Sequence, residues 1–396
     1  MLGLLTFEEA LERILGRAER LPPEAVTLTE AFGRVVAEPL LARVDLPPFA
    51  SSAMDGFAVR ADETPGTLPI AMRVAAGSPA TATLPEGAAA AIATGGAVPD
   101  GADTVVPVER TNEHDGRVEI AERVQPGSHI RPRGGDVRAG VAVIHSGSRV
   151  GAAQIGALAA AGVAEIRCSR RPRVAVLATG SELRAPGETL EPGQIFESNG
   201  AMIAAVLGDV ADVELLPVVR DEEGAHREAL ERGLAADVLV TSGGVSMGPH
   251  DLVRRVAAEL GVEEVFWGVA VKPGKPLSFG VRDKTLVFGL PGNPVSSLVG
   301  ALLFVKPALL ARQGLEHPGP EFGVGRAMSP LRRNPQRDEF VRASRSVDEQ
   351  GVVLEPVAGQ ESHMIVRAAS ADALLHVPRG SGEIARGEVV RYLPLA

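Results

Sequence analysis

The strongest constraint on the fold is the regular alternation of apolar runs and helix-like segments between Arg171 and Leu310. The apolar runs are continuous, which is typical of parallel strands that helices bury on both faces. The pattern therefore predicts an α/β region with a central, doubly wound parallel sheet. We expect strands at residues 174–178, 215–219, 238–240, 265–271 and 285–290, and helices at 200–207, 222–234, 251–260 and 295–310.

The segments on either side of this region predict smaller domains. Thr6 and Glu9 fit a capping box at the start of a helix over residues 6–20, which we expect to dock on another domain. Residues 47–136 and 326–396 consist of short apolar segments broken by turns, so they predict a small mostly-β domain and a C-terminal β-barrel-like domain. The 396 residues thus divide into four expected domains: 1–46 with 139–170 as an N-terminal linking domain, 47–138, 171–315 and 316–396.

Composition excludes several classes of protein. A net charge of -10 and only 3% aromatic residues argue against nucleic acids and anionic membranes as partners. The single cysteine, Cys168, cannot form an intramolecular disulfide or a multi-thiolate metal site. The N-terminus lacks a signal peptide's basic and long apolar regions, and apolar runs such as residues 298–305 are far short of the roughly 20 residues that span a membrane. We therefore expect a cytoplasmic protein, and an anionic substrate would need a local basic pocket.

Two glycine-containing loops follow strands of the expected sheet. Ligands of doubly wound sheets bind beyond the carboxyl ends of the strands, where these loops lie. The first loop, residues 241–251, combines glycines with hydroxyls and leads into a helix whose amides could hold an oxyanion. The second is a turn that leads into another helix. The loops provide two sets of candidate substrate-binding residues: Ser242, Gly243, Gly244 and Ser246, then Pro291, Gly292, Asn293 and Pro294.

Lysine is rare in this chain, with 4 Lys against 36 Arg, and two of the four stand in Lys272-Pro273-Gly274-Lys275-Pro276. Two ammonium groups on a proline-stiffened turn after the strand at 265–271 predict a local site for phosphate. The turn is not a Walker loop, because no hydroxyl residue follows the lysine. A carboxylate, Glu182, follows the strand at 174–178, where an ordinary helix start is an equally good interpretation.

One rival interpretation is an α/β hydrolase, because residues 244–248 match the nucleophile motif G-x-S-x-G between a strand and a helix. Three residues separate the strand from this motif, whereas a nucleophile serine follows its strand almost at once. The histidine partner would have to be His317, His363 or His376, all of which lie outside the α/β region.

The expected β domain contains three polar motifs whose local chemistry alone assigns no function. Asp55 lies in an Asp-Gly turn before a short strand, and Thr94 lies in Ala93-Thr94-Gly95-Gly96. Arg131 and Asp136 belong to the charged loop Arg131-Pro132-Arg133-Gly134-Gly135-Asp136.

Taken together and in this order, the motifs resemble those of the molybdopterin molybdenumtransferase family, which includes the bacterial MoeA proteins and the E domain of animal gephyrin. The resemblance rests on residues 52–58, 92–95, 131–136, 179–183, 242–248, 272–276 and 290–294, with a looser match at 359–364. It implies an elongated homodimer of four-domain subunits, with each active site between the α/β domain of one subunit and the β domain of the other.

The resemblance also implies a reaction, in which adenylylated molybdopterin and molybdate give molybdenum cofactor and AMP in the presence of Mg²⁺. It makes Asp55, Asp136 and Glu182 catalytic candidates, and Glu182, Asp221 and Asp251 candidate metal ligands. Carboxylates beside anionic substrates are consistent with such a metal, which would offset their repulsion. The candidates for substrate binding are Thr94, Arg131, both loops, Lys272 and Lys275.

Further partners implied are the molybdopterin adenylyltransferase and proteins that receive the cofactor. Two alternatives stay open. The chain could catalyse the preceding adenylylation, whose enzymes share the α/β domain, although the additional domains argue against it. It could also be an assembly scaffold, although no long linker or fused domain supports that role.

Overall fold

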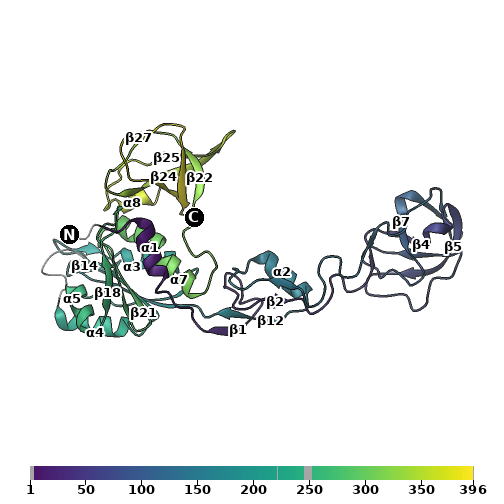
Figure 1. Cartoon of the computed structure of the whole chain (residues 1–396), viewed down its shortest axis with the longest axis horizontal. Coiled ribbons are helices and arrows are strands. Elements are labelled where there is room, and N and C mark those ends of the chain that lie inside the picture. Colours follow the sequence, from purple (N-terminus) through teal and green to yellow (C-terminus); the bar gives the residue numbers. More distant parts are fainter. Residues whose placement is uncertain (1–3, 221, 245–251, 396) are drawn as a thin grey trace.

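The computed structural model describes residues 4–220, 222–244 and 252–395. The molecule is elongated, as Figure 1 shows. The α/β domain and a C-terminal barrel lie at one end, a small β domain lies at the other, and a linking domain lies between them. The chain runs through the linking domain twice, on its way to the small β domain and on its way back (Figure 1). The domain limits drawn from the sequence stay a prediction.

The α/β domain is built on a six-stranded sheet in the order β16-β13-β17-β21-β20-β18. The first four strands are parallel, whereas β20 runs antiparallel to both of its neighbours. The strands are β13 (Arg173–Ala178), β16 (Asp212–Leu215), β17 (Val238–Ser242), β18 (Glu263–Trp267), β20 (Ser278–Arg282) and β21 (Thr285–Leu290). The helices are α3 (Asn199–Leu207), α4 (Glu223–Gly233), α5 (Leu252–Glu259), α6 (Pro294–Gly300) and α7 (Lys306–Arg312), with a π-helical turn, η3 (Ala301–Val305), between the last two.

Helices cover both faces of this sheet, so the doubly wound architecture predicted from the sequence is confirmed. Along β13, Val174 and Val176 pack into a core with α1, α3 and the α6–α7 segment, while Ala175 and Leu177 pack into a second core with α4 and α5. Successive side chains of a strand point to opposite faces, and both faces are apolar here. The continuous apolar runs follow from this two-sided burial.

Three expectations for the α/β region were wrong in detail. A strand was expected at residues 215–219, but the strand is β16, which ends at Leu215. This edge strand is largely exposed and therefore lacks an apolar run, whereas the apolar residues after it, Leu216 and Val219, pack in the core beneath α4 and α5. The strand expected at 265–271 ends at Trp267, and residues 271–272 form β19 (Val271–Lys272), which pairs with the C-terminal domain. Strand β20 was missed, so the sheet is mixed rather than wholly parallel.

The segment Pro294–Arg312 is the one helical stretch in the described ranges whose length and hydropathy would suffice to cross a membrane. Of this stretch, 67% is buried inside the protein, as in the core helix of a globular domain.

The N-terminal helix, α1 (Phe7–Leu15), has the predicted capping box between Thr6 and Glu9 but ends five residues before the expected limit of 20. Its buried residues, Phe7, Ala10 and Ile14, belong to the core of the α/β domain. The Phe7 ring meets Phe304 of η3 at 5.6 Å and Phe340 of the C-terminal barrel at 5.9 Å between ring centroids. The helix therefore packs between the α/β domain and the barrel.

The linking domain contains two antiparallel strand pairs, β1 (Pro23–Thr27) with β12 (Glu165–Ser169) and β2 (Leu40–Leu41) with β11 (Ala142–Ile144). Helix α2 (Ala152–Ala160) packs on them through Leu158, in a core with Val26, Ile166 and Cys168. The two passes of the chain are thus held together by strand pairing.

Cys168 is fully buried in this core and is a free thiol. Burial raises the pKa of the thiol to about 11, so almost no thiolate exists near neutral pH. We expect iodoacetamide at pH 8 to leave the native protein unmodified and to modify Cys168 fully in denaturant, with intact mass as the measurement. Rapid modification of the native protein would show instead that the core of the linking domain opens readily.

The small β domain has a six-stranded sheet in the order β7-β4-β6-β5-β9-β8. The strands are β4 (Gly56–Val59), β5 (Gly66–Val74), β6 (Ala89–Ile92), β7 (Thr104–Pro107), β8 (Thr111–His114) and β9 (Arg117–Ile120). Short 3-10 turns, η1 (Ala61–Glu63) and η2 (Val108–Arg110), link the strands. A separate pair, β3 (Ser51–Ser52) with β10 (Ile130–Arg131), lies at the entry and exit of the domain.

The C-terminal domain contains a closed ring of five strands, β24-β25-β22-β28-β26, in which β26 pairs back to β24. The predicted barrel is therefore confirmed. Its strands are β22 (Gly323–Ala327), β24 (Asp338–Asp348), β25 (Gly351–Pro356), β26 (Ala373–Val377) and β28 (Val389–Pro394), and β23 (Leu331–Arg332), β27 (Glu383–Ile384) and helix α8 (Ile365–Ala368) complete the domain.

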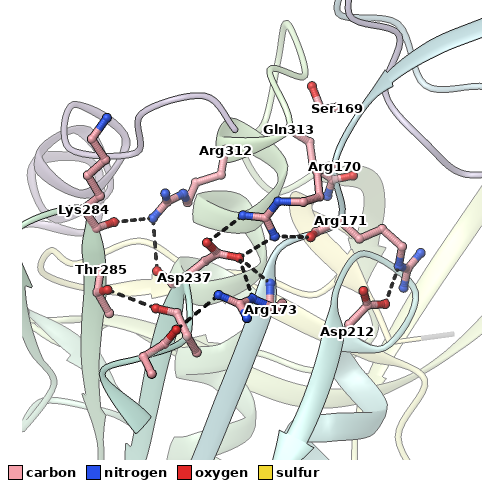
Figure 2. Close-up of polar contacts among 12 residues, drawn as sticks. Ser169, Arg170, Arg171, Arg173, Asp212, Asp237, Lys284, Thr285, Arg312 and Gln313 are labelled. Carbon is pink, nitrogen blue, oxygen red and sulfur yellow. Dashed lines mark hydrogen bonds and ion pairs between the residues drawn. The ribbon is translucent and has the colours of Figure 1, made fainter. Parts of the chain in front are cut away.

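A charged cluster joins the linking domain to the α/β domain at the end of the sheet opposite the carboxyl ends of its parallel strands (Figure 2). The carboxylate of Asp237 accepts two hydrogen bonds of 2.8 Å from the Arg170 guanidinium and one of 2.7 Å from the Arg173 amide. Arg312, which is 3% exposed, donates to the carbonyls of Asp237 and Lys284. Arg170 lies in the connection between β12 and β13, so these bonds hold the point at which the chain enters the sheet.

Candidate functional site

A cavity of about 850 Å³ lies at the carboxyl ends of β13, β17 and β21. Its position agrees with the rule that ligands of doubly wound sheets bind beyond these strand ends. The lining comes from residues 178–180, 182–183, 195–199, 242–244, 275–276 and 291–294, with Trp267, His363 and Ile365.

The glycines of the first loop are required by backbone geometry. Gly243 and Gly244 have φ values of +94° and +66°, which side-chain-bearing residues rarely adopt. A Cβ on Gly243 would lie 2.6 Å from the Thr179 carbonyl oxygen, and one on Gly244 would lie 2.4 Å from a methyl group of Val253. The loop therefore passes close to its neighbours and presents backbone to the cavity. Ser246, a candidate from the same loop, lies outside the described residues.

Asn199, at the start of α3, joins the two predicted loops. Its side-chain amide donates to Ser242 Oγ and to the carbonyl of Gly292, both at 2.8 Å. Ser242 is 2% exposed and also contacts Ser297 Oγ at 3.2 Å. The structure therefore brings Ser242, Gly243, Gly244 and the turn Pro291–Pro294 together at one cavity. Asn199 was not predicted, since a single Asn at a helix start carries no signal in the sequence.

The two lysines of the Lys-Pro-Gly-Lys-Pro turn differ in position. Lys275 is exposed and lines the cavity. Lys272 lies on β19, beside the C-terminal barrel, and its ammonium group is paired with Glu339 at 3.0 Å. The sequence had suggested that the turn follows a strand of the parallel sheet, but it follows β19, which pairs with the barrel. Of the two lysines, Lys275 lines the cavity and Lys272 does not.

Glu182 is an exposed carboxylate at the cavity. Asp221 and Asp251, the other two candidate metal ligands, lie outside the described residues. Across residues 4–220, 222–244 and 252–395, no group of three or more His, Cys, Asp and Glu side chains is close enough to hold a metal ion.

A loop of the C-terminal barrel closes part of the cavity through His363 and Ile365. Arg342, 1% exposed, fixes this loop by donating to the carbonyls of Gly359 and Met364, both at 2.7 Å. The Val295 amide of α6 donates to the Ser362 carbonyl at 3.1 Å, which ties the loop to the α/β domain. The sequence marks His363 only as a possible hydrolase partner or as part of a loose motif, and it gives no sign that His363 lies at this cavity.

The three motifs of the small β domain meet around the strand pair β3–β10. The amide and hydroxyl of Thr94 donate to Asp55 Oδ1, at 2.7 Å and 3.0 Å. These hydrogen bonds, the backbone one foremost, lower the pKa of the exposed Asp55 carboxyl. Arg131 pairs with Ser51 across β3–β10, and Asp136 is exposed after the following turn.

The candidate residues thus form two groups, which one chain does not bring together. Figure 1 shows β4, next to Asp55, at one end of the molecule and β14 (Leu183–Arg184), next to Glu182, at the other. Asp55, Thr94, Arg131 and Asp136 belong to the first group, and the cavity residues belong to the second.

Models of three protein regions match successive parts of the chain. They are the MoeA N-terminal region (domain I and II) at residues 5–162, a probable molybdopterin binding domain at 175–311 and the MoeA C-terminal region (domain IV) at 324–395.

Curated proteins match along nearly the whole chain. Molybdopterin molybdenumtransferase 2 of Mycobacterium tuberculosis is 38% identical, over 92% of this chain and 93% of its own length. Molybdopterin molybdenumtransferase of Haemophilus influenzae is 34% identical, over 99% of this chain and 98% of its own length.

The crystal structure of the molybdopterin biosynthesis MoeA protein of Pyrococcus horikoshii OT3 superimposes with a TM-score of 0.86 at 28% identity, covering 99% of this chain and 100% of that one. Full-length relatives above 30% identity and the ordered matches to MoeA regions leave one assignment. The chain belongs to the molybdopterin molybdenumtransferase (MoeA) family.

Proposed function

We propose that this protein inserts molybdate into adenylylated molybdopterin and releases AMP, in the biosynthesis of the molybdenum cofactor. The observation that carries the proposal is the cavity at the strand ends, where two glycine-containing loops and Lys275 face the same space. Molybdate and the phosphoanhydride are anions, and backbone amides with an ammonium group are the donors that bind oxyanions. Both substrates therefore fit the chemistry of this cavity.

The test is an incubation of the purified protein with adenylylated molybdopterin, molybdate and Mg²⁺, with AMP measured by chromatography. We expect AMP release that depends on molybdate. Absence of molybdate-dependent AMP would contradict the proposal, and formation of an AMP adduct from molybdopterin and ATP would support the adenylyltransferase alternative instead.

A requirement for Mg²⁺ is part of the proposal. In nucleotide-dependent enzymes Mg²⁺ is commonly held by one or two carboxylates together with substrate phosphates and water. Glu182 offers such an oxygen donor at the anion cavity, so the residues present fit the metal. Bound there, Mg²⁺ would polarise the phosphoanhydride. The chain's own donors orient the anions, and a chelator is expected to stop AMP release.

We further propose that the working form is a homodimer in which the small β domain of one subunit completes the cavity of the other. Separation of the two candidate groups within one chain supports this arrangement. Exposed apolar side chains in and beside the linking domain offer a surface for a second copy: Phe32, Leu41, Val44, Phe49 and Val141. A cytoplasmic location, delivery of the substrate by an adenylyltransferase and transfer of the product to cofactor-receiving proteins complete the proposal.

The two lysines of the turn provide a matched pair of variants. Lys275→Ala is expected to raise the KM for adenylylated molybdopterin by about tenfold, the loss of about one charge-assisted contact. Lys272→Ala should change KM less than about threefold, because that ammonium group is already paired with Glu339. Steady-state kinetics of AMP release measure both values, and equal effects would contradict the separation of the two roles.

A further inference from the structure

Two aromatic side chains line the cavity, in a chain with only 3% aromatic residues. Phe196 lies on β15 (Ile195–Phe196) and is 44% exposed, whereas many phenylalanines of the chain are buried in its cores. Trp267, the single tryptophan of the sequence, is the last residue of β18 and is half-buried. An exposed phenyl ring costs free energy unless something covers it, so Phe196 suggests a ligand with an apolar or aromatic face.

The two rings reach the cavity from two different sheets, because β15 belongs to a separate two-stranded sheet and β18 is an edge strand of the six-stranded sheet. Phe196 stands on β15, which pairs with β14, and β14 follows directly after β13. Trp267 ends the edge strand on the other side, with β17, β21 and β20 between β13 and β18. Four strand spacings separate β13 from β18, about 19 Å in all. The glycine loops and Lys275 contribute to the same lining between them.

The indole of Trp267 is held in a fixed orientation. The guanidinium carbon of Arg254, on α5, stands 5.6 Å from the ring centroid. Arg254 is itself fixed by two hydrogen bonds of 2.9 Å to Glu264. Arg254 also lines a separate cavity of about 330 Å³, to which Trp267 does not contribute, whereas Trp267 lines the large cavity. A fixed aromatic ring is a suitable stacking platform, because it loses little side-chain entropy on binding.

We propose that Trp267 and Phe196 are the two stacking platforms for the planar heterocycles of the substrate, one at each side of the cavity. This inference rests on the proposed function, because adenylylated molybdopterin carries two such ring systems, adenine and pterin, joined through a phosphoanhydride. The arrangement places the anionic link over Lys275 and the glycine loops, and one heterocycle against each aromatic ring. Stacking of a base on an aromatic side chain contributes enough for about 10- to 100-fold in affinity.

The sequence offers a direct probe, since Trp267 is the only tryptophan and the only tyrosine, Tyr392, lies in the C-terminal barrel. The full-length protein is titrated with AMP, with neopterin monophosphate and with ribose 5-phosphate, and tryptophan fluorescence is recorded. We expect one of the two heterocyclic ligands to quench Trp267 and ribose 5-phosphate to leave it unchanged. Quenching by AMP would assign adenine to the Trp267 side, and quenching by the pterin would assign the pterin there.

Variants test both platforms by calorimetry, which needs no fluorophore. Trp267→Leu should weaken the ligand that quenches by 10- to 100-fold, and Trp267→Phe should restore most of the affinity. Phe196→Ala should weaken the other ligand, and Phe196→Tyr should not. Leu190→Ala is the matched control, because Leu190 is 39% exposed on the same segment but is not among the cavity-lining residues.

Two outcomes separate this inference from the proposed function. If the wild type releases AMP but neither ligand quenches Trp267 and Trp267→Leu binds both normally, the stacking assignment is wrong and the proposed function stands. If the wild type releases no AMP in a molybdate-dependent way, the proposed function itself fails.

Discussion

Asp55→Ala is expected to lower kcat for AMP release by on the order of 100-fold or more, with an unchanged melting temperature. The carboxylate is exposed and buries no apolar surface, so its removal leaves the fold intact. Two hydrogen bonds from Thr94 hold it in one orientation and lower its pKa, so it is charged at neutral pH. An oriented charge with no ion-pair partner in the described part of the chain is suited to act on a substrate or its metal. Steady-state kinetics and thermal melts measure the two quantities.

Two further variants separate the charge of Asp55 from its shape. Asp55→Asn keeps an oxygen acceptor for Thr94 but removes the charge, so it should be nearly as inactive as Asp55→Ala. Asp62→Ala removes another exposed carboxylate of the same domain and should keep normal activity. Full activity in Asp55→Asn would show that the reaction does not use the charge.

Mixing two inactive variants tests whether Asp55 acts on the cavity of a second subunit. Asp55→Ala impairs the small β domain, and Glu182→Ala impairs the cavity at the other end of the chain (Figure 1). If each site takes one domain from each subunit, a mixed dimer contains one doubly defective and one intact site. After subunit exchange of equal amounts, about a quarter of wild-type activity should return, because half of the dimers are mixed. No recovery after verified exchange would place both residues in sites made by one chain.

The sequence predicted the architecture of the α/β domain better than its edges. Central strands such as β21 are buried on both faces, so continuous apolar runs identify them in the sequence. The edge strand β16 is largely exposed, and its predicted position fell on the apolar residues that follow it. Strand β20 was missed because no helix precedes it; it follows a turn and runs antiparallel to β21. Local periodicity predicts burial, and strand direction depends on contacts distant in sequence.

The candidate cavity was predicted where chemistry is concentrated in short motifs and missed where it depends on tertiary packing. The glycine loops and Lys275 carry local signals, and they do line one cavity. Asn199, Phe196 and Trp267 reach it from separate elements, and none stands in a recognisable pattern. The pairing of Lys272 with Glu339 could not be predicted from the sequence either, because β19 and β24 come together only through the docking of the barrel.

The second large effect is expected from Asp237→Ala, which should destabilise the folded protein by about 3 kcal/mol, the lower end of the range for breaking a buried ion pair, because this pair is only partly buried. The Asp237 side chain is 12% exposed and accepts three hydrogen bonds, two from Arg170 and one from the Arg173 amide (Figure 2). Its removal leaves the half-buried Arg170 guanidinium without its carboxylate partner. Chemical denaturation followed by circular dichroism measures the free energy of unfolding.

Asp212 supplies the control, because it also pairs with an arginine of the same connection, Arg171, at 3.0 Å, but is 65% exposed. Asp212→Ala should therefore lower the free energy of unfolding by less than about 1 kcal/mol.

The pH dependence of stability gives a second check on the Asp237 ion pair. Burial raises the pKa of Asp237, but hydrogen bonds from Arg170 and the Arg173 amide outweigh it and leave the pKa below its usual 3.8. A lowered folded-state pKa stabilises the fold above about pH 4, and the contribution is lost as pH falls through the folded-state value. The stability difference between wild type and Asp237→Asn should therefore be largest near neutral pH and shrink below pH 4, and a difference that stays constant into that acid range would show that the ion pair is not its source.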